Sequence, residues 1–236
     1  GKILSTPATK DLSRVMLEDT ANILSNSESG KQYDLENIYS ERIVHHTFSL
    51  WDTVELHKNH ELGKGFSFYL KDAGHILGSS MFEISYNGKK IVFTGDLGNS
   101  PSPLLRDTEF IENADYVVME SVYGNRNHEE RSERRENLKK IILENYKNKG
   151  TLVVPIFSLE RTQEFLYEIN EMVEAGEVPS HPIFVDSPLA IKVTEVFYRH
   201  KNLFKDSVLQ DISSGDDIFK FKGLKETEKT QDSKAI

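Results

Sequence analysis

The sequence predicts an α/β protein whose first part contains a β-hairpin and whose second part alternates strands and helices. Three observations support this class. Apolar residues follow helical spacing over 7–25, an Asn87-Gly88 pair separates two strand-like runs, and helices alternate with strands from about residue 129 onward. Such alternation is typical of right-handed crossovers and a mainly parallel sheet.

The first part opens on a helix and continues toward the hairpin. Thr6-Pro7 favours a helix start, because Thr is a good N-cap and Pro fits the first helical turn. Polar residues 26–32 predict a loop. Further elements expected before the hairpin are helical pieces at 34–44 and 52–60 and a strand at 66–70.

The hairpin is the strongest local signal in the chain. Strand-like runs at 81–86 and 90–94 flank Asn87-Gly88, and both turn residues accept the positive φ that a two-residue turn requires. We expect the strand at 66–70 to complete a three-stranded unit. A proline-containing loop at 100–114 then leads to an apolar strand at 116–119.

The second part reads as strands and helices in turn, followed by a polar tail. Its expected elements are a helix at 129–147, a strand at 151–155, a helix at 160–174, a strand at 182–186, a helix at 188–204 and a loop at 213–234.

Composition limits the function classes. No apolar run approaches the roughly 18 residues of a membrane span, and no cleavable signal peptide opens the chain, so we expect a cytoplasmic protein. Because the chain has no cysteine, a metal ion has only His and carboxylate ligands here. A net charge of −9 disfavours nucleic-acid binding by bulk electrostatics and requires any such contact to be local.

One imidazole and one carboxylate are expected to meet at the hairpin. His75 lies just before its first strand and Asp96 just after its second, so both fall at the same end of the sheet. An imidazole beside a carboxylate is a natural half of a metal site. Each residue alone is also typical of an ordinary loop or turn, and the residues themselves leave both interpretations open.

A second carboxylate, Glu120, follows the apolar strand at 116–119, which we expect to be buried. A carboxylate at the end of a buried strand is typical of a functional position and equally of a helix N-cap, so both interpretations stand.

The densest basic cluster accompanies the helix expected at 129–147. Interleaved acids predict i,i+4 ion pairs on a solvated face rather than a nucleic-acid surface. The basic residues are Arg126, Arg131, Arg134, Arg135, Lys139 and Lys140, and the acids are Glu129, Glu130, Glu133 and Glu136.

Several segments resemble motifs of one family. Residues 72–79 (DAGHILGS) and 93–96 (FTGD) resemble the third and fourth metal-binding motifs of the metallo-β-lactamase superfamily. Other segments are similar to its β-CASP branch of RNA-processing nucleases, whose members include a cleavage-and-polyadenylation endonuclease subunit. These are 120–124 (ESVYG, with Val122 where Thr is usual), 155–164 (PIFSLERTQE), 186–190 (DSPLA) and the opening 5–9 (STPAT).

The resemblance implies a specific architecture. Residues 1–124 correspond to the later portion of a metallo-β-lactamase αββα sandwich, and residues 125–236 to the first portion of an inserted β-CASP domain with a parallel α/β sheet. The family's upstream His-x-His-x-Asp-His motif and its two later histidines do not occur in this sequence. The chain therefore reads as an internal fragment that retains part of the ligand set.

The resemblance also implies a chemistry. Asp96 bridges two zinc ions, His75 binds one of them, and Glu120 orients a later histidine that protonates the leaving oxygen. Arg161, inside one signature, contacts phosphates or braces the fold. The implied substrate is RNA, in single-stranded form, and the implied assembly is a homodimer or an RNA-processing complex.

Two rival functions are weighed against this hydrolase. A catalytically inactive scaffold subunit would have no need to keep both His75 and Asp96. A small-substrate metallo-hydrolase would lack the insertion that begins after Glu120.

Overall fold

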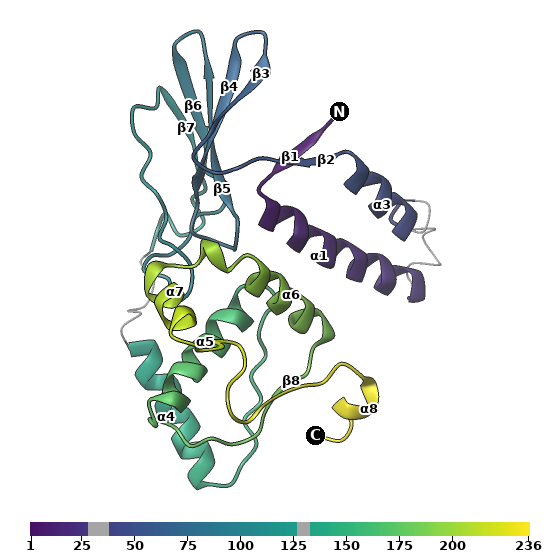
Figure 1. Ribbon diagram of the computed structural model, residues 1–236, viewed down its shortest axis with the longest axis vertical. Helices are drawn as coiled ribbons and strands as arrows, with labels where there is room; N and C mark the ends of the chain where they lie inside the picture. The colour runs from purple at the N-terminus through teal and green to yellow at the C-terminus, as the bar shows by residue number, and fades with distance from the viewer. Residues whose placement is uncertain (28–37, 127–132) are drawn as a thin grey trace. The chain divides into compact units, whose positions relative to one another are not determined.

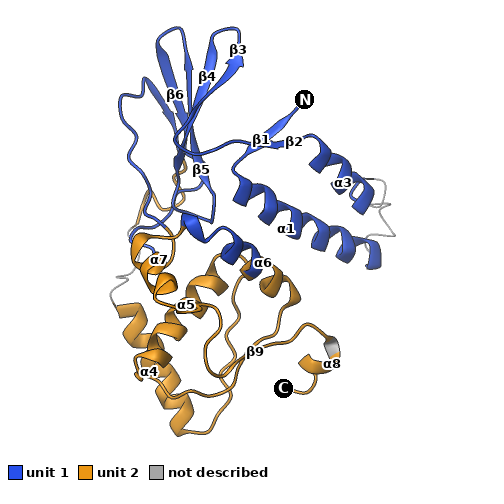
Figure 2. Cartoon of the chain, viewed as in Figure 1, with its two compact units in different colours: residues 1–102, 106–119, 195–203 blue, residues 103–105, 120–194, 204–236 orange. Residues whose placement is uncertain are grey.

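The computed structural model describes residues 1–27, 38–126 and 133–236, which form two compact units (Figures 1 and 2). Unit 1 comprises residues 1–102, 106–119 and 195–203, and unit 2 comprises residues 103–105, 120–194 and 204–236. Mixed sheets and helices confirm the α/β class. The predicted domain boundary after residue 124 stays a prediction. Each unit contains a short segment from the other side of this boundary, residues 103–105 in unit 2 and residues 195–203 in unit 1.

Unit 1 opens on a strand, β1 (Ile3–Ser5), and a long helix, α1 (Pro7–Asn26). Thr6 caps α1 as predicted, since its hydroxyl accepts the N–H of Thr9 at 3.2 Å. This bond satisfies one of the donors that a helix start leaves free. The loop predicted at 26–32 begins inside α1, and residues 28–32 lie outside the described part of the chain.

The helix predicted at 52–60 is wrong. The structure has α3 (Glu41–Ser49), then β2 (Trp51–Thr53) and β3 (Asn59–Gly63). β2 is strand because it pairs in parallel with β1, a partner that local spacing does not reveal. The helix predicted at 34–44 is found later, at 41–49, and residues 34–37 lie outside the described part.

The main sheet of unit 1 has five strands in the order β3-β4-β5-β6-β7. After β3 the strands are β4 (Phe66–Asp72), β5 (Ser80–Tyr86), β6 (Lys89–Phe93) and β7 (Tyr116–Val118). Neighbours are antiparallel except for β6 and β7, which are parallel. The Asn87-Gly88 turn has φ of 48° and 72°, as the hairpin prediction requires.

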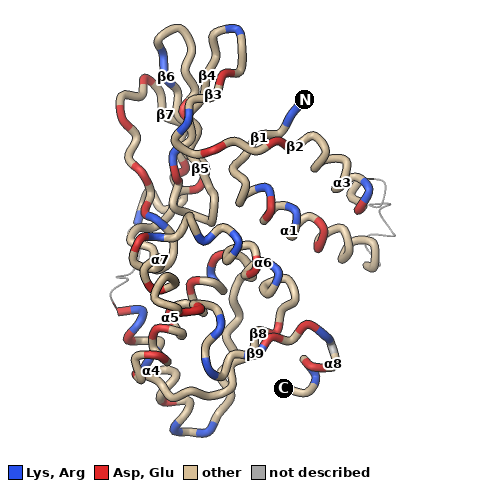
Figure 3. The backbone as a smooth tube through the Cα atoms, viewed as in Figure 1, with Lys and Arg blue, Asp and Glu red and all other residues tan. Residues whose placement is uncertain are grey.

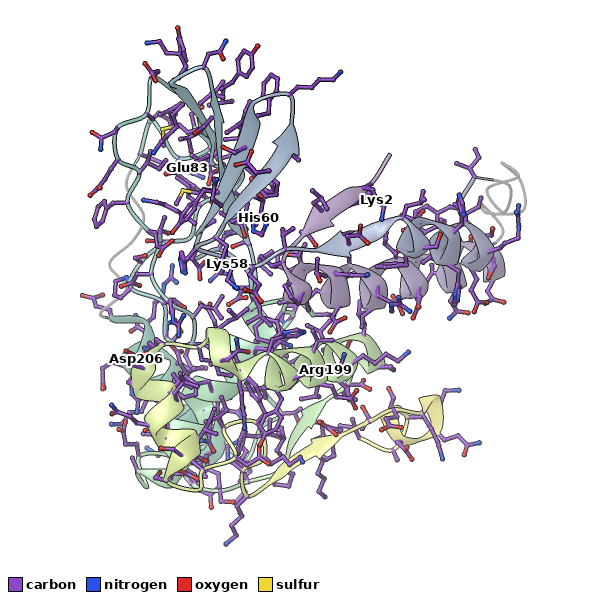
Figure 4. All side chains as sticks on the ribbon, turned by 45° about the horizontal axis from the view of Figure 1, so that its top comes forward. Lys2, Lys58, His60, Glu83, Arg199 and Asp206 are labelled. Atoms are coloured by element: carbon purple, nitrogen blue, oxygen red, sulfur yellow. The ribbon has the colours of Figure 1, made fainter. Side chains whose placement is uncertain are left out.

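One buried carboxylate of this sheet is paired with two lysines. Glu83 of β5, labelled in Figure 4, is buried, and its oxygens lie 3.7 Å from the Lys71 ammonium and 3.1 Å from that of Lys90. Two cations thus offset the cost of removing this charge from water.

Unit 2 is mainly helical. Its elements are α4 (Arg134–Lys147), α5 (Arg161–Glu174), β8 (Ile183–Val185), the first part of α6 (Pro188–Arg199), α7 (Asp206–Ser213), β9 (Leu224–Glu226) and α8 (Thr230–Ser233). The end of α6 and a 3₁₀ turn, η3 (Lys201–Leu203), belong to unit 1. β8 and β9 pair in parallel.

Two sequence predictions for unit 2 are wrong. Residues 151–155 form no strand, because no strand among the described residues pairs with them, and Val153 is 80% exposed. The segment at 213–234 is not a polar loop throughout. It contains β9 and buries Ile218 and Phe219 in the core of unit 2. The helices predicted at 160–174 and 188–204 are confirmed, although the second breaks after Arg199.

Within the described residues, no helix is both long and apolar enough to cross a membrane.

Candidate metal centre

The structure brings His75 and Asp96 together. His75 lies in the loop between β4 and β5, Asp96 follows β6, and the His75 Nε2 atom is 3.9 Å from Asp96 Oδ2. The His75 side chain is 34% exposed and that of Asp96 is 75% exposed, so both can reach a ligand from solvent. The structure thus confirms that the two side chains lie close together at one end of the hairpin, as predicted.

Hydrogen bonds with Ser79 hold the His75 loop. The Ser79 hydroxyl accepts the N–H groups of His75 and Ile76, both at 3.2 Å, and Ser79 N–H donates to the Ile76 carbonyl at 2.8 Å. These bonds close a tight loop directly before β5. The imidazole therefore projects from a backbone with few alternative conformations.

The start of α1 holds the other end of this loop. The hydroxyls of Thr6 and Thr9 donate to the Gly78 carbonyl at 2.7 and 2.9 Å. Gly78 has φ of +81°, and a Cβ there would lie 2.7 Å from the Ala8 Cβ atom. Glycine is thus required on both conformational and steric grounds. The segment at 5–9 owes its place beside the centre to these contacts, which sequence spacing alone did not reveal.

A third segment, from the loop predicted at 100–114, clamps the end of β4. The Glu109 carboxylate accepts the Asp72 N–H at 2.7 Å and contacts His57 Nε2 at 2.9 Å. Glu109 N–H donates to the Asp72 carbonyl at 3.1 Å. Burial raises the pKa of Asp72, and the hydrogen bond from Gly74 N–H opposes this rise. No sequence motif indicated Glu109.

The distance between His75 and Asp96 fits two ligands of one zinc ion. Zinc bonds of about 2.0–2.1 Å in a tetrahedral arrangement place two ligand atoms about 3.3 Å apart. The observed 3.9 Å exceeds this separation by about 0.6 Å, and the Asp96 side chain is 75% exposed. Within residues 1–27, 38–126 and 133–236, no three His, Asp or Glu side chains are grouped so as to hold a metal ion. The described residues thus offer two candidate ligands, fewer than the three or four that a zinc site needs.

Glu120 follows β7 by two residues and falls in unit 2. It is partly buried, but β7 is not, since Tyr116 and Val118 are 62% and 52% exposed. The expectation of a buried strand before Glu120 is therefore wrong, because β7 lies at the end of the strand order and pairs only with β6. The role of Glu120 stays a prediction.

Arg161 is the first residue of α5, and its guanidinium donates to the Glu164 carboxylate at 2.7 Å. The Arg161 side chain is 47% exposed. Because the Arg161 side chain pairs with Glu164 and is also partly exposed, both roles, contact with phosphates and bracing of the fold, stay predictions.

The basic cluster pairs differently from the prediction. Arg135 and Lys139 of α4 both contact Glu177, each at 3.1 Å, and Glu177 follows α5 rather than lying on α4. Arg126 stacks over the Tyr123 ring at 4.9 Å. Figure 3 shows Lys and Arg interspersed with Asp and Glu in both units, as expected for solvated surfaces. Residues 127–132, with Glu129, Glu130 and Arg131, lie outside the described part.

The remaining family signatures form hydrogen bonds inside unit 2. Gln163 is buried, and its amide donates to the Ser158 carbonyl at 3.2 Å and to the Thr194 hydroxyl at 2.9 Å. Asp186 accepts the hydroxyls of Thr227 and Ser233 at 2.7 and 2.9 Å. The Gln163 contacts connect α5 to α6, and the Asp186 contacts connect the end of β8 to residues 227 and 233, so both signatures stabilise unit 2.

Comparison with known proteins gives one domain match in unit 2 and relatives that match both units. Residues 162–236 match the Beta-Casp domain model. The chain is 30% identical to Endoribonuclease YSH1 of Kluyveromyces lactis over 230 residues, which cover 93% of this chain and 30% of that protein. It is also 30% identical over 236 residues to Ribonuclease TTHA0252 of Thermus thermophilus, which covers 100% of this chain and 52% of that protein. The chain thus spans only about a third to a half of the length of these relatives, but its matches run through both units. The Beta-Casp match over residues 162–236 and these two ribonuclease relatives support the resemblance of the chain to the β-CASP branch of the metallo-β-lactamase superfamily.

Proposed function

We propose that this protein hydrolyses phosphodiester bonds in RNA, with zinc ions bound at the pair formed by His75 and Asp96. The observation that carries the proposal is the 3.9 Å distance between His75 Nε2 and Asp96 Oδ2 at the end of the hairpin. The names of the relatives, an endoribonuclease and a ribonuclease, support RNA as the substrate.

The ligand roles follow from the chemistry of the two side chains. His75 offers an imidazole nitrogen, and Asp96 offers a carboxylate whose two oxygens can contact two ions. Imidazole and carboxylate are both common zinc ligands. Bound zinc supplies Lewis acidity, which activates water and offsets phosphate charge. The chain itself orients His75 through the Ser79 and Gly78 hydrogen bonds that hold its loop.

Glu120 takes the positioning role that the resemblance implies. Its carboxylate would accept the ring N–H of a family histidine that does not occur in this sequence, and so fix the tautomer that donates a proton to the leaving 3′-oxygen. Single-stranded RNA is the favoured form, because its unstacked bases and its backbone are both accessible to side chains. With a net charge of −9, phosphate recognition is local to the metal centre.

Zinc content and RNA cleavage of the intact protein test the proposal together. Asp96→Ala and His75→Ala should each weaken zinc binding by more than about tenfold, since loss of an outer-shell partner alone costs that much. Cleavage of a single-stranded RNA should fall with zinc occupancy. Asp52→Ala is the matched control, because Asp52 is an exposed carboxylate of unit 1 that pairs with Lys2.

The outcomes separate the candidate functions. Unchanged zinc affinity in Asp96→Ala would remove Asp96 from the ligands. Wild-type cleavage by that variant after zinc loss would reject metal-dependent hydrolysis. A protein that binds zinc through this pair and leaves RNA intact would instead be the scaffold subunit.

A further inference from the structure

The two loops that carry His75 and Asp96 meet at a junction that includes Thr108. Gly98 N–H donates to the Ala73 carbonyl at 2.8 Å. The Thr108 hydroxyl lies 3.0 Å from that same carbonyl oxygen and 3.2 Å from the Gly98 carbonyl oxygen. One hydroxyl is thus within hydrogen-bond distance of both loops.

The hydroxyl is presented by a segment that is itself fixed. Thr108 N–H donates to the Ser100 hydroxyl at 3.1 Å. The next residue, Glu109, forms two hydrogen bonds with the main chain of Asp72, which ends β4. Thr108 is half-buried between these contacts. The junction therefore connects β4, the His75 loop and the Asp96 loop through protein groups alone.

Its position in the chain gives the junction a consequence for the ligands. Ala73 precedes His75 by two residues, and Gly98 follows Asp96 by two. A shift between Ala73 and Gly98 therefore passes almost directly to the two side chains. Metal sites tolerate only about 0.2 Å of error in ligand distances, so a small change at the junction alters the pair.

We propose that Thr108 is a positioning residue whose hydroxyl holds the two loops together, so that His75 and Asp96 face a common ion. Its relevance to catalysis rests on the proposed zinc-dependent function, whereas its effect on the two loops does not. Thr108 contacts no reacting atom and acts only through the Ala73 and Gly98 carbonyls.

The test compares Thr108→Val, which keeps the shape and removes the donor, with Thr108→Ser, which keeps the donor. Hydrogen exchange of the Gly98 amide reports opening of the junction. In Thr108→Val this amide should exchange about fivefold faster, as expected for the loss of one hydrogen bond. The Val54 amide, which donates to the Ser5 carbonyl at 2.9 Å away from the junction, should not change.

A second readout follows the ligand pair without metal. Asp96→Asn should shift the NMR signals of the His75 ring in the wild-type background, because the two groups are 3.9 Å apart. The same substitution should shift them less when Thr108 is Val, and Thr108→Ser should restore the full response. Circular dichroism of each variant verifies that the chain is folded.

Two results would overturn the inference. An unchanged Gly98 exchange rate in Thr108→Val would show that the hydroxyl does not hold the loops. A faster Gly98 amide with an unchanged His75 response would show that it stabilises the loop without placing the ligands. If both readouts change as expected while His75→Ala leaves zinc affinity unchanged, the positioning of the pair stands and the zinc proposal fails.

Discussion

Replacing Gly98 by Ala should force the two ligand loops apart. A Cβ atom at residue 98 would lie 1.7 Å from the Gly74 carbonyl oxygen and 2.9 Å from the His75 amide nitrogen, both main-chain atoms. Because Cβ atoms essentially never approach closer than 3.0 Å, the oxygen must retreat by at least about 1.3 Å. This distance is several times the tolerance of a metal site.

The cost follows from the hydrogen bonds that this shift breaks. Gly98 N–H donates to Ala73 at 2.8 Å, and the Gly98 carbonyl accepts from Thr108 at 3.2 Å. At about 1 kcal/mol for each, their loss lowers the free energy of unfolding by about 2 kcal/mol. For a chain of this length, Tm should fall by about 4–8 °C in a thermal melt followed by circular dichroism. Zinc affinity should fall by more than about tenfold in the same variant.

Gly150→Ala is the matched control for this substitution. Its added Cβ would also be close to a neighbour, 2.7 Å from Asn145 Oδ1, but that atom ends a side chain that can rotate. Its Tm should stay within about 2 °C of the wild type. A Gly98→Ala protein with wild-type Tm and zinc affinity would refute the close contact between the loops.

Two further predictions concern unit 2. Glu160 has φ of 65° and ψ of −57°, and Arg161 N–H donates to the Leu159 carbonyl at 2.8 Å, which is a strained γ-turn. Glu160→Gly should raise Tm by about 2–4 °C through relief of about 1 kcal/mol of strain, and a lower Tm would mean that the carboxylate stabilises more than the turn costs. Burial, and the charges of Asp211 and Asp217, raise the pKa of Asp216 above its ordinary 3.8, so the folded state holds the proton more tightly than the unfolded state. The free energy of unfolding is then lost as pH rises from 3.8 through the raised pKa of Asp216. In urea unfolding, Asp216→Asn should be more stable than the wild type at pH 7 and equal to it below about pH 3.8. An equal gain in stability at both pH values would exclude titration of Asp216 as the cause.

The sequence predicted those features that depend on neighbouring residues. Asn87-Gly88 specifies its own turn through positive φ, and the turn then places the ends of β5 and β6 together with His75 and Asp96. The Thr6 cap likewise acts within one helical turn. In these cases the physical cause lies within a few residues, so the pattern is visible in the sequence.

The missed features depend on distant partners. Residues 51–53 form the strand β2 because β1 pairs with them. Residues 151–155 do not form a strand, because no strand among the described residues pairs with them. Thr108 contacts Ala73 across 35 positions, a separation at which no spacing rule applies. Of the candidate site, the sequence therefore indicated the two proposed ligands and not the groups that hold their loops.

This difference bears on how a metal ion would bind. The His75 and Asp96 loops are held by hydrogen bonds to the main-chain carbonyls of Ala73, Gly78 and Gly98. Because protein groups alone form these bonds, the loops pay their ordering entropy on folding rather than on binding. The two proposed ligands would then approach an ion from loops that are already ordered. Loosening the junction transfers part of that entropy cost to the binding step, so changes at Gly98 or Thr108 should weaken zinc binding although neither residue touches the ion.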